Sequence, residues 1–219
     1  MSKKEQVLDG IIAQGMLPLF FYEDEQVSLE VVRTLYKAGV RVIEYTNRGE
    51  AALDNFTVIK KAQQIELPGL YIGAGTVKTV TEAEAFMAAG ADFIVSPIIN
   101  AEVGKTVHRH NLLWVPGCMT PTEIFNAQQN DAALIKIFPA SILGLKFLNA
   151  IKELFPGQCF VPTGGVELTT ESISAWFNAG VCAVGFGSQL ISKEVLDNKL
   201  YDQLYNDTIL ATEIIQSCK

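Results

Sequence analysis

Residues 17–24 read Leu-Pro-Leu-Phe-Phe-Tyr-Glu-Asp, a short apolar run that ends in two acidic residues. We interpret residues 17–22 as the first strand, and the amphipathic stretch at 26–38 as the helix that follows it. An open, doubly wound sheet would carry a glycine-rich phosphate-binding turn directly after its first strand. The sequence has Phe20-Phe21-Tyr22-Glu23-Asp24 there instead, which favours a closed barrel over an open sheet.

The alternation of apolar runs with helix-length stretches continues to the end of the chain. It predicts parallel strands joined by crossover helices, and therefore an α/β protein. Eight such units within 219 residues fit one compact (β/α)8 TIM barrel, a single domain over residues 1–219. The further strands are expected at 41–46, 70–76, 93–97, 113–118, 133–139, 159–163 and 183–187. The further helices are expected at 50–64, 79–89, 100–109, 120–128, 145–154, 169–178 and 193–216.

Shorter signals support the same architecture. Residues 5–15 predict an extra N-terminal helix that covers the bottom of the barrel with one apolar face, formed by Val7, Leu8, Ile11 and Ile12. Ala-Gly pairs at 38–39, 89–90 and 179–180 predict helices that end on a left-handed glycine.

Composition excludes several classes of function. The chain has 17 Lys and Arg against 24 Asp and Glu, a net charge of −7, which argues against a nucleic-acid partner. No apolar segment approaches the roughly 18–20 residues of a membrane helix, and the N-terminus does not resemble a signal peptide. We therefore expect a cytoplasmic protein without a membrane partner.

The cysteines and histidines argue against a metal site. The four cysteines form no C-x-x-C pair, and the two histidines, His108 and His110, do not share a helical face. We expect the cysteines to be buried, reduced thiols and the histidines to be solvated, with no metal and no cofactor.

Two charged residues inside apolar strands carry the chemical signal. In strand 133–139, Lys136 shares a face with Leu134 and Phe138, whereas the two isoleucines suit the helix layer. In strand 41–46, Glu44 shares its face with Val42 and Thr46, so both charges should point into the barrel. The pair could simply fix strand register. Its position towards the C-terminal ends of the strands favours catalysis, in which a lysine forms a Schiff base with a ketone and a carboxylate moves protons.

Glycine-rich corners close the last two strands. Thr163-Gly164-Gly165 and Gly187-Ser188 stand where such barrels bind phosphate through backbone N–H groups, although tight turns also need glycine. Thr76 could meet a substrate carboxylate at the end of its strand or close a tight turn. Arg48 could clamp an anion or be a solvated surface charge.

From residue 16 to residue 190, the chain closely resembles the short class I aldolases that act on 2-keto-3-deoxy-6-phosphogluconate (KDPG) and 4-hydroxy-2-oxoglutarate. The ordered set of motifs is more specific than any one of them. It comprises Gly39-Val40-Arg41-Val42-Ile43-Glu44-Tyr45-Thr46, Arg48, Gly73-Ala74-Gly75-Thr76-Val77, Phe93-Ile94-Val95-Ser96-Pro97, Pro116-Gly117, Thr120-Pro121-Thr122-Glu123, Lys136-Ile137-Phe138-Pro139-Ala140, Pro162-Thr163-Gly164-Gly165-Val166 and Gly187-Ser188.

The resemblance implies a function and a set of site residues. It implies cleavage of the phosphorylated 2-keto acid to pyruvate and glyceraldehyde 3-phosphate, or of 4-hydroxy-2-oxoglutarate to pyruvate and glyoxylate, by a metal-free homotrimer. Lys136 would form the Schiff base and Glu44 would be the general acid and base. Arg48, Thr76 and Pro97 would surround the keto-acid end, with Phe138 packed against it. The residues beside the distal phosphate or hydroxyls would be Thr163, Gly164, Gly165 and Ser188.

The chain departs from the family pattern at several positions. Phe20-Phe21 stands where some relatives carry an arginine, Tyr45 and Asn47 replace smaller or aliphatic residues, and the 141–144 loop is more apolar. A galactonate-derived or unphosphorylated substrate therefore stays open, although Thr163 favours the gluconate isomer. Outside the aldolases, the alternatives are a non-covalent phosphosugar isomerase or epimerase, and an inactive barrel that binds keto acids.

Overall fold

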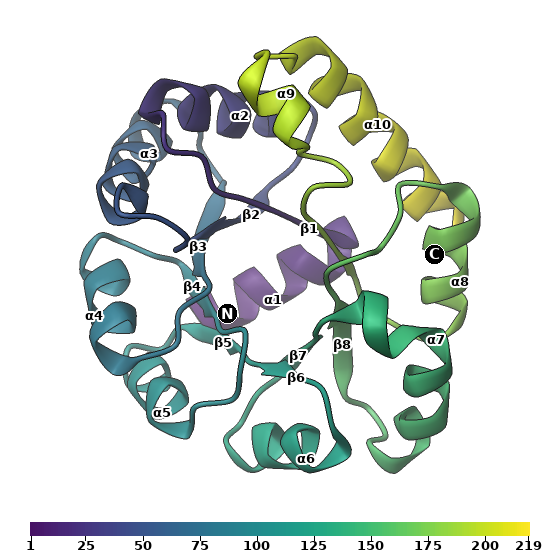
Figure 1. Cartoon of the computed structure of the whole chain (residues 1–219). Coiled ribbons are helices and arrows are strands. Elements are labelled where there is room, and N and C mark those ends of the chain that lie inside the picture. Colours follow the sequence, from purple (N-terminus) through teal and green to yellow (C-terminus); the bar gives the residue numbers. More distant parts are fainter.

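The computed structural model describes residues 1–219 and has an α/β fold in which every strand pairing is parallel. Figure 1 shows the strands around the middle of the molecule, the other helices around the outside, and α1 across one end. The strands are β1 (Met16–Phe20), β2 (Val42–Thr46), β3 (Tyr71–Gly75), β4 (Phe93–Val95), β5 (Leu113–Val115), β6 (Gly117–Cys118), β7 (Leu134–Ile137), β8 (Cys159–Pro162) and β9 (Val184–Phe186). The helices are α1 (Lys3–Gln14), α2 (Glu25–Lys37), α3 (Ala52–Glu66), α4 (Val80–Ala88), α5 (Ala101–Arg109), α6 (Pro121–Gln129), α7 (Ala140–Ile151), the 3-10 helix η1 (Lys152–Leu154), α8 (Thr170–Asn178), α9 (Lys193–Asp197) and α10 (Tyr201–Ser217).

The strands pair as two parallel sheets rather than as one uninterrupted eight-stranded ring. One sheet has the order β5-β4-β3-β2-β1-β9 and the other has the order β6-β7-β8. The predicted strand 113–118 is divided at Pro116 into β5 and β6, because proline has no N–H to donate to a ladder. Between β8 and β9 the pairing is a single bridge, Thr163 with Gly185.

Alternation along the strands divides the apolar core into two layers. The inner cluster contains Val42 and Leu134, together with Val7 and Ile11 from α1. The outer cluster, between strands and helices, contains the residues that alternate with them, such as Ile43. The N-terminal helix therefore covers one end of the strands as predicted, with Leu8 half-buried against the inner cluster.

Several helix boundaries differ from the prediction. The seventh helix begins at Ala140 rather than at residue 145, and it is kinked at Gly144, which has φ 64° and ψ 179°. The predicted final helix, 193–216, is two helices, and Lys199 between them has a left-handed φ of 54°. The extra helix begins at Lys3 because Ser2 and Glu5 form a capping box.

The predicted glycine signals for helix ends are confirmed. Gly39, Gly90 and Gly180 follow their helices with φ of 94–96°, the left-handed geometry that a glycine cap needs.

No helix combines the length and the apolar character that crossing a membrane requires. Of the four free cysteines only Cys118 is fully buried, so the expectation of buried thiols is wrong for the other three.

Candidate active site

Lys136 and Glu44 face each other across the interior of the fold. Lys136 lies on β7 and Glu44 on β2, which belong to different sheets. Their side chains are almost completely buried, with residue exposures of 5% and 1%. The distance from Lys136 Nζ to Glu44 Oε1 is 3.6 Å. The structure therefore brings together the two charges that strand alternation assigned to one interior.

The polar atoms around this pair are buried without partners. Neither carboxylate oxygen of Glu44 has a hydrogen-bond partner, and the Oγ1 of Thr46, two residues along the same face, has none either. Such atoms are uncommon in native proteins, and each costs about 1–3 kcal/mol. The Glu44 carboxylate and the Thr46 hydroxyl can therefore still form hydrogen bonds to a bound molecule.

Gly75 makes room for the Glu44 carboxylate. It lies on β3, whose residues pair in parallel with those of β2. A Cβ atom on Gly75 would lie 1.9 Å from Glu44 Oε1 and 2.6 Å from its Cδ. Since no side chain fits there, glycine is required at this position for the carboxylate to lie where it does.

A second buried lysine forms a closer ion pair than Lys136 does. Lys60 is also 5% exposed, and its Nζ lies 2.6 Å from Asp92 Oδ2. Asp92 also accepts a bond of 2.8 Å from the Ile72 backbone N–H and pairs with Lys3. Burial lowers the pKa of Lys60, against the attraction of Asp92. Here the carboxylate is fully used, in contrast to that of Glu44.

An aromatic ring lies beside the buried Lys136 amine. Lys136 Nζ lies 5.2 Å from the centroid of the Phe138 ring, within the range of a cation–π contact. Phe138 is half-buried and also lines a cavity of about 220 Å³ at the C-terminal ends of the strands. Phe138 thus contacts both the buried amine and the open cavity.

That cavity, which we call the mouth cavity, collects six of the predicted site residues: Arg48, Phe138, Thr163, Gly164, Gly165 and Ser188. Phe20 and Phe21 line it as well, and Arg48 is its only charged side chain. Gln189 also lines it, although sequence reasoning did not single it out. The only available signal was its position next to Ser188.

The glycine corners supply free backbone donors. Gly164 and Gly165 have left-handed φ of 83° and 92°, and the Gly164 carbonyl accepts a bond of 2.7 Å from the Ser141 N–H. The N–H groups of Gly165 and Ser188 donate to no backbone carbonyl. Donors of this kind at the C-terminal ends of parallel strands suit an anionic or hydroxyl-bearing group.

Thr76 and Pro97 lie at neighbouring strand ends but do not line the mouth cavity. Both are half-buried, and Thr76 has φ 61°. A left-handed backbone is unusual for a β-branched residue, and such strain is concentrated at functional sites. Of the three residues predicted to surround the keto-acid end of the substrate, Arg48 lines the mouth cavity, whereas Thr76 and Pro97 lie outside it.

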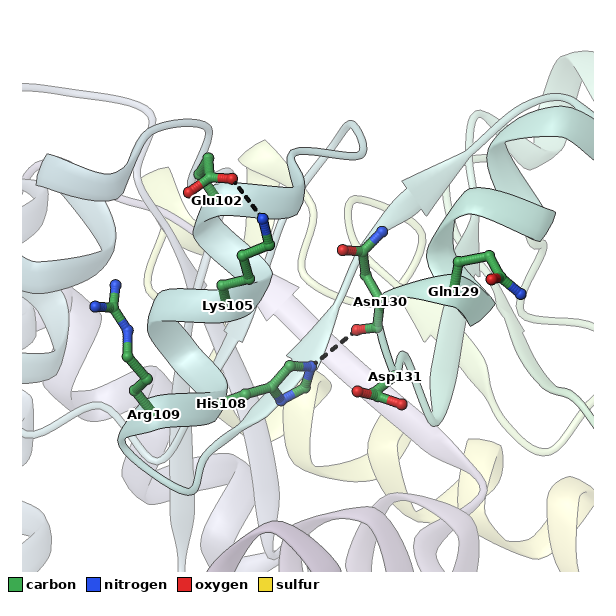
Figure 2. A pocket seen from close by; sticks show the side chains of 7 residues that line it. All are labelled: Glu102, Lys105, His108, Arg109, Gln129, Asn130 and Asp131. Atoms are coloured by element: carbon green, nitrogen blue, oxygen red, sulfur yellow. Dashed lines mark hydrogen bonds and ion pairs between the residues drawn. The ribbon is translucent and has the colours of Figure 1, made fainter.

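A larger cavity, of about 720 Å³, lies between α5 and the end of α6 (Figure 2), and neither Lys136 nor Glu44 lines it. All of its lining residues are polar, and several of them bond to one another. Lys105 forms an ion pair with Glu102 at 2.8 Å, and His108 Nε2 donates a hydrogen bond to the Asn130 carbonyl at 3.1 Å. His108 is half-buried beside Trp114, so the expectation that it is solvated is wrong. No group of three or more His, Cys, Asp or Glu side chains could hold a metal ion.

Comparison with known proteins gives a consistent result. The family described as KDPG and KHG aldolase matches residues 9–206. The chain is 33% identical, over 74% of its length and 76% of the relative's, to 2-dehydro-3-deoxy-phosphogluconate aldolase of Treponema pallidum. It is 38% identical, over 54% of its length and 58% of the relative's, to 2-dehydro-3-deoxy-6-phosphogalactonate aldolase of Escherichia coli. A solved structure of KDPG aldolase from Legionella pneumophila, with pyruvate captured as a covalent carbinolamine intermediate, superposes with a TM-score of 0.83 at 26% identity, over 91% of this chain and 95% of that one.

Proposed function

The chain belongs to the KDPG and KHG aldolase family, and from that premise we propose that it is a class I aldolase acting through a Schiff base on Lys136. Its reaction is the cleavage of 2-dehydro-3-deoxy-6-phosphogluconate to pyruvate and glyceraldehyde 3-phosphate. The observation that carries the proposal is the buried Lys136–Glu44 ion pair, which spans 3.6 Å and leaves neither carboxylate oxygen in a hydrogen bond.

The first steps form the Schiff base. The neutral amine of Lys136 adds to the C2 ketone, and the substrate oxygen takes up a proton to give a carbinolamine. Glu44, which lies beside the amine, donates a proton to that oxygen, and water leaves. The product is an iminium ion on Lys136, and the proton that Glu44 gave up has left with the water.

The next steps break the carbon–carbon bond. Glu44 takes the proton of the C4 hydroxyl through a water molecule, and the electrons of the C3–C4 bond move into the iminium. Glyceraldehyde 3-phosphate leaves, and an enamine remains on Lys136. Protonation at C3 and addition of water then release pyruvate and regenerate the amine. Each general acid or base step contributes about 10²–10⁴-fold to the rate.

Other residues bind the two ends of the substrate in this proposal. Arg48, Thr76 and Pro97 surround the carboxylate and ketone, and Phe138 packs against them. The strained backbone at Thr76 supports its role. The distal phosphate or hydroxyls lie beside Thr163, Gly164, Gly165 and Ser188, a role that the free N–H groups of the glycine corners support.

The substrate has three alternatives within the same chemistry: 4-hydroxy-2-oxoglutarate, the galactonate isomer and an unphosphorylated keto acid. Thr163 before the two glycines favours the gluconate isomer. Arg48 is the only charged side chain of the mouth cavity, so a phosphate there would depend mainly on backbone donors.

The proposal extends to architecture and assembly. The two sheets would form a closed (β/α)8 barrel in one domain, with Pro116 as the only break between β5 and β6 and with the Thr163–Gly185 bridge at the other seam. The assembly would be a homotrimer, as the family resemblance implies. Four free thiols favour a reducing, cytoplasmic location.

Borohydride reduction in the presence of pyruvate tests the Schiff base. The intact mass should rise by one reduced pyruvate adduct, and peptide mapping should place the adduct on Lys136. Lys60→Met is a matched control, because Lys60 is equally buried but its ion pair is closed; this variant should still form the adduct, whereas Lys136→Met should not. The absence of any adduct would favour a non-covalent isomerase or epimerase. An adduct without cleavage of KDPG would favour an inactive keto-acid binder.

A further inference from the structure

The seam between β8 and β9 carries two cysteines at the N-terminal ends of the strands, opposite the end with the mouth cavity. Cys159 is the first residue of β8, and Cys182 stands two residues before β9. The Cys182 N–H donates to the Phe160 carbonyl at 3.1 Å. This bond aligns the two chain segments as neighbours in a parallel sheet, where strands are about 4.8 Å apart.

The two cysteines lie on these adjacent segments, because Cys159 directly precedes Phe160, whose carbonyl accepts the bond from Cys182. The Cys182 side chain lowers the pKa of Cys159 to about 7, and Cys159 raises the pKa of Cys182. Both side chains are half-buried rather than enclosed. A thiolate therefore forms at neutral pH on the segment next to a second thiol, the arrangement found in redox-active cysteine pairs.

The other two cysteines lack this arrangement. Cys118 is fully buried, and burial raises its pKa to about 12. Cys218 lies 3.1 Å from the Ser174 hydroxyl, at the end of α10. They therefore serve as internal comparisons for the pair at the seam.

We propose that Cys159 and Cys182 form a redox-modification site, at which a peroxide converts the two thiols into a disulfide that joins β8 to β9. The Cys159 thiolate attacks one oxygen of hydrogen peroxide; the O–O bond breaks, and the released hydroxide leaves as water. The resulting sulfenic acid is attacked by the Cys182 sulfur, the S–S bond forms, and a second water leaves with the Cys182 proton. Two thiols are oxidised and one peroxide is reduced.

The fold gives this disulfide a structural consequence. Apart from the Cys182–Phe160 bond, the β8–β9 seam has a single bridge, Thr163 with Gly185. The same two strands lead into the glycine corners of the mouth cavity at their other ends. A covalent link would stabilise the seam by restricting the unfolded chain. Because it forms at the opposite end of the strands, it should leave the rate of pyruvate adduct formation on Lys136 unchanged.

The test uses the full-length protein, hydrogen peroxide and a tryptic digest. Cys159 and Cys182 lie on one tryptic peptide, residues 153–193, which contains no other cysteine. After oxidation and treatment with iodoacetamide, this peptide should be lighter than the reduced one by two hydrogen atoms and should carry no alkyl group. The peptides with Cys118 and Cys218 should be fully alkylated. Unfolding in urea should shift to a higher midpoint, and dithiothreitol should reverse both changes.

Two variants and one control sharpen the result. Cys159→Ser and Cys182→Ser should each remove the lighter peptide and the midpoint shift, whereas Cys118→Ser should keep both. The proposal is overturned if both thiols of the wild-type peptide still take iodoacetamide. It is also overturned if they gain oxygen without linking, or if they link two chains instead of one.

Discussion

Lys136 Nζ lies 3.6 Å from Glu44 Oε1, too far for a full hydrogen bond, although both side chains are nearly inaccessible to solvent. The other buried pair, Lys60 with Asp92, closes to 2.6 Å. A buried ion pair repays its desolvation only when its geometry is good and its remaining polar atoms are satisfied. The looser pair is thus less favourable as a structural element, and it leaves both groups able to bind a third.

Replacing Glu44 with glutamine tests its role as acid and base. Glu44→Gln keeps the shape of the side chain but cannot exchange a proton, so kcat for KDPG cleavage should fall about 10²–10⁴-fold. Coupled assay of pyruvate release measures the rate, and circular dichroism with thermal unfolding checks the fold. A folded variant with a nearly normal kcat would refute the role.

Gly75→Ala should reduce catalysis by displacing the Glu44 carboxylate. A Cβ atom at Gly75 would lie 1.9 Å from Glu44 Oε1, whereas one at Gly73, on the same strand, would lie 2.4 Å from the Phe93 ring. Both changes overpack the interior and should each cost about 1–3 kcal/mol of unfolding free energy. Only Gly75→Ala should also reduce kcat strongly, as measured beside Gly73→Ala by the pyruvate assay. Equal kcat values in the two variants would contradict this.

Strand alternation was enough to predict that Lys136 and Glu44 point into one interior. In strand 133–139, Ile135 and Ile137 do pack in the outer layer while Leu134 packs in the inner one, so Lys136 had to face inwards. Because side chains alternate along a strand, Lys136 could face either the interior or the helix layer. The isoleucines occupy the face that packs against the helices, so the interior was the face left for Lys136.

Features that depend on distant partners could not be predicted. Whether Lys60 forms an ion pair with Asp92 depends on how α3 packs against the strands. The proximity of Cys159 to Cys182 depends on the register of β8 with β9. Pro116 is a different case, because its missing N–H is a local signal in the sequence that the periodicity of strand 113–118 does not register. Local pattern specifies faces, whereas pairings between segments far apart in the sequence depend on tertiary structure.

Tyr45→Phe should destabilise the protein and weaken substrate binding at the mouth cavity. The Tyr45 hydroxyl is buried and lies 3.0 Å from the Tyr22 carbonyl, 3.2 Å from Ser28 Oγ and 3.3 Å from Asn55 Nδ2. Loss of these contacts should lower the unfolding free energy by about 1–3 kcal/mol. It should also raise KM for KDPG more than it lowers kcat, because Phe21, next to Tyr22, lines the cavity.

Urea unfolding and steady-state kinetics of Tyr45→Phe provide the measurement. Tyr36→Phe is the matched control, since its exposed hydroxyl bonds only to the Pro68 carbonyl; its unfolding free energy should change little. Equal losses of stability in the two variants would show that the buried Tyr45 contacts add nothing.

Alkylation of Cys159 should follow a titration centred near neutral pH. The neighbouring Cys182 side chain lowers the Cys159 pKa to about 7, so the reactive thiolate accumulates as the pH rises through that value. Rates of iodoacetamide labelling, measured by peptide mass between pH 5 and pH 9 (a range of about two pH units on either side), should be half-maximal near that point. In Cys182→Ala the midpoint should move upwards, and an unchanged midpoint would contradict the role of Cys182.

The distal end of the substrate can be separated from the keto-acid end with a single variant. Ser188 lines the mouth cavity beside the glycine corner and is exposed to it. A hydrogen bond from a hydroxyl to a charged phosphate contributes about 1.5–3 kcal/mol, so Ser188→Ala should raise KM for KDPG roughly 10–100-fold. Pyruvate and 4-hydroxy-2-oxoglutarate carry no distal phosphate, so borohydride trapping of the former and cleavage of the latter should change little. If all three reactions weaken together, Ser188 supports the whole site rather than the phosphate. If none weakens, the phosphate is bound by the backbone donors alone.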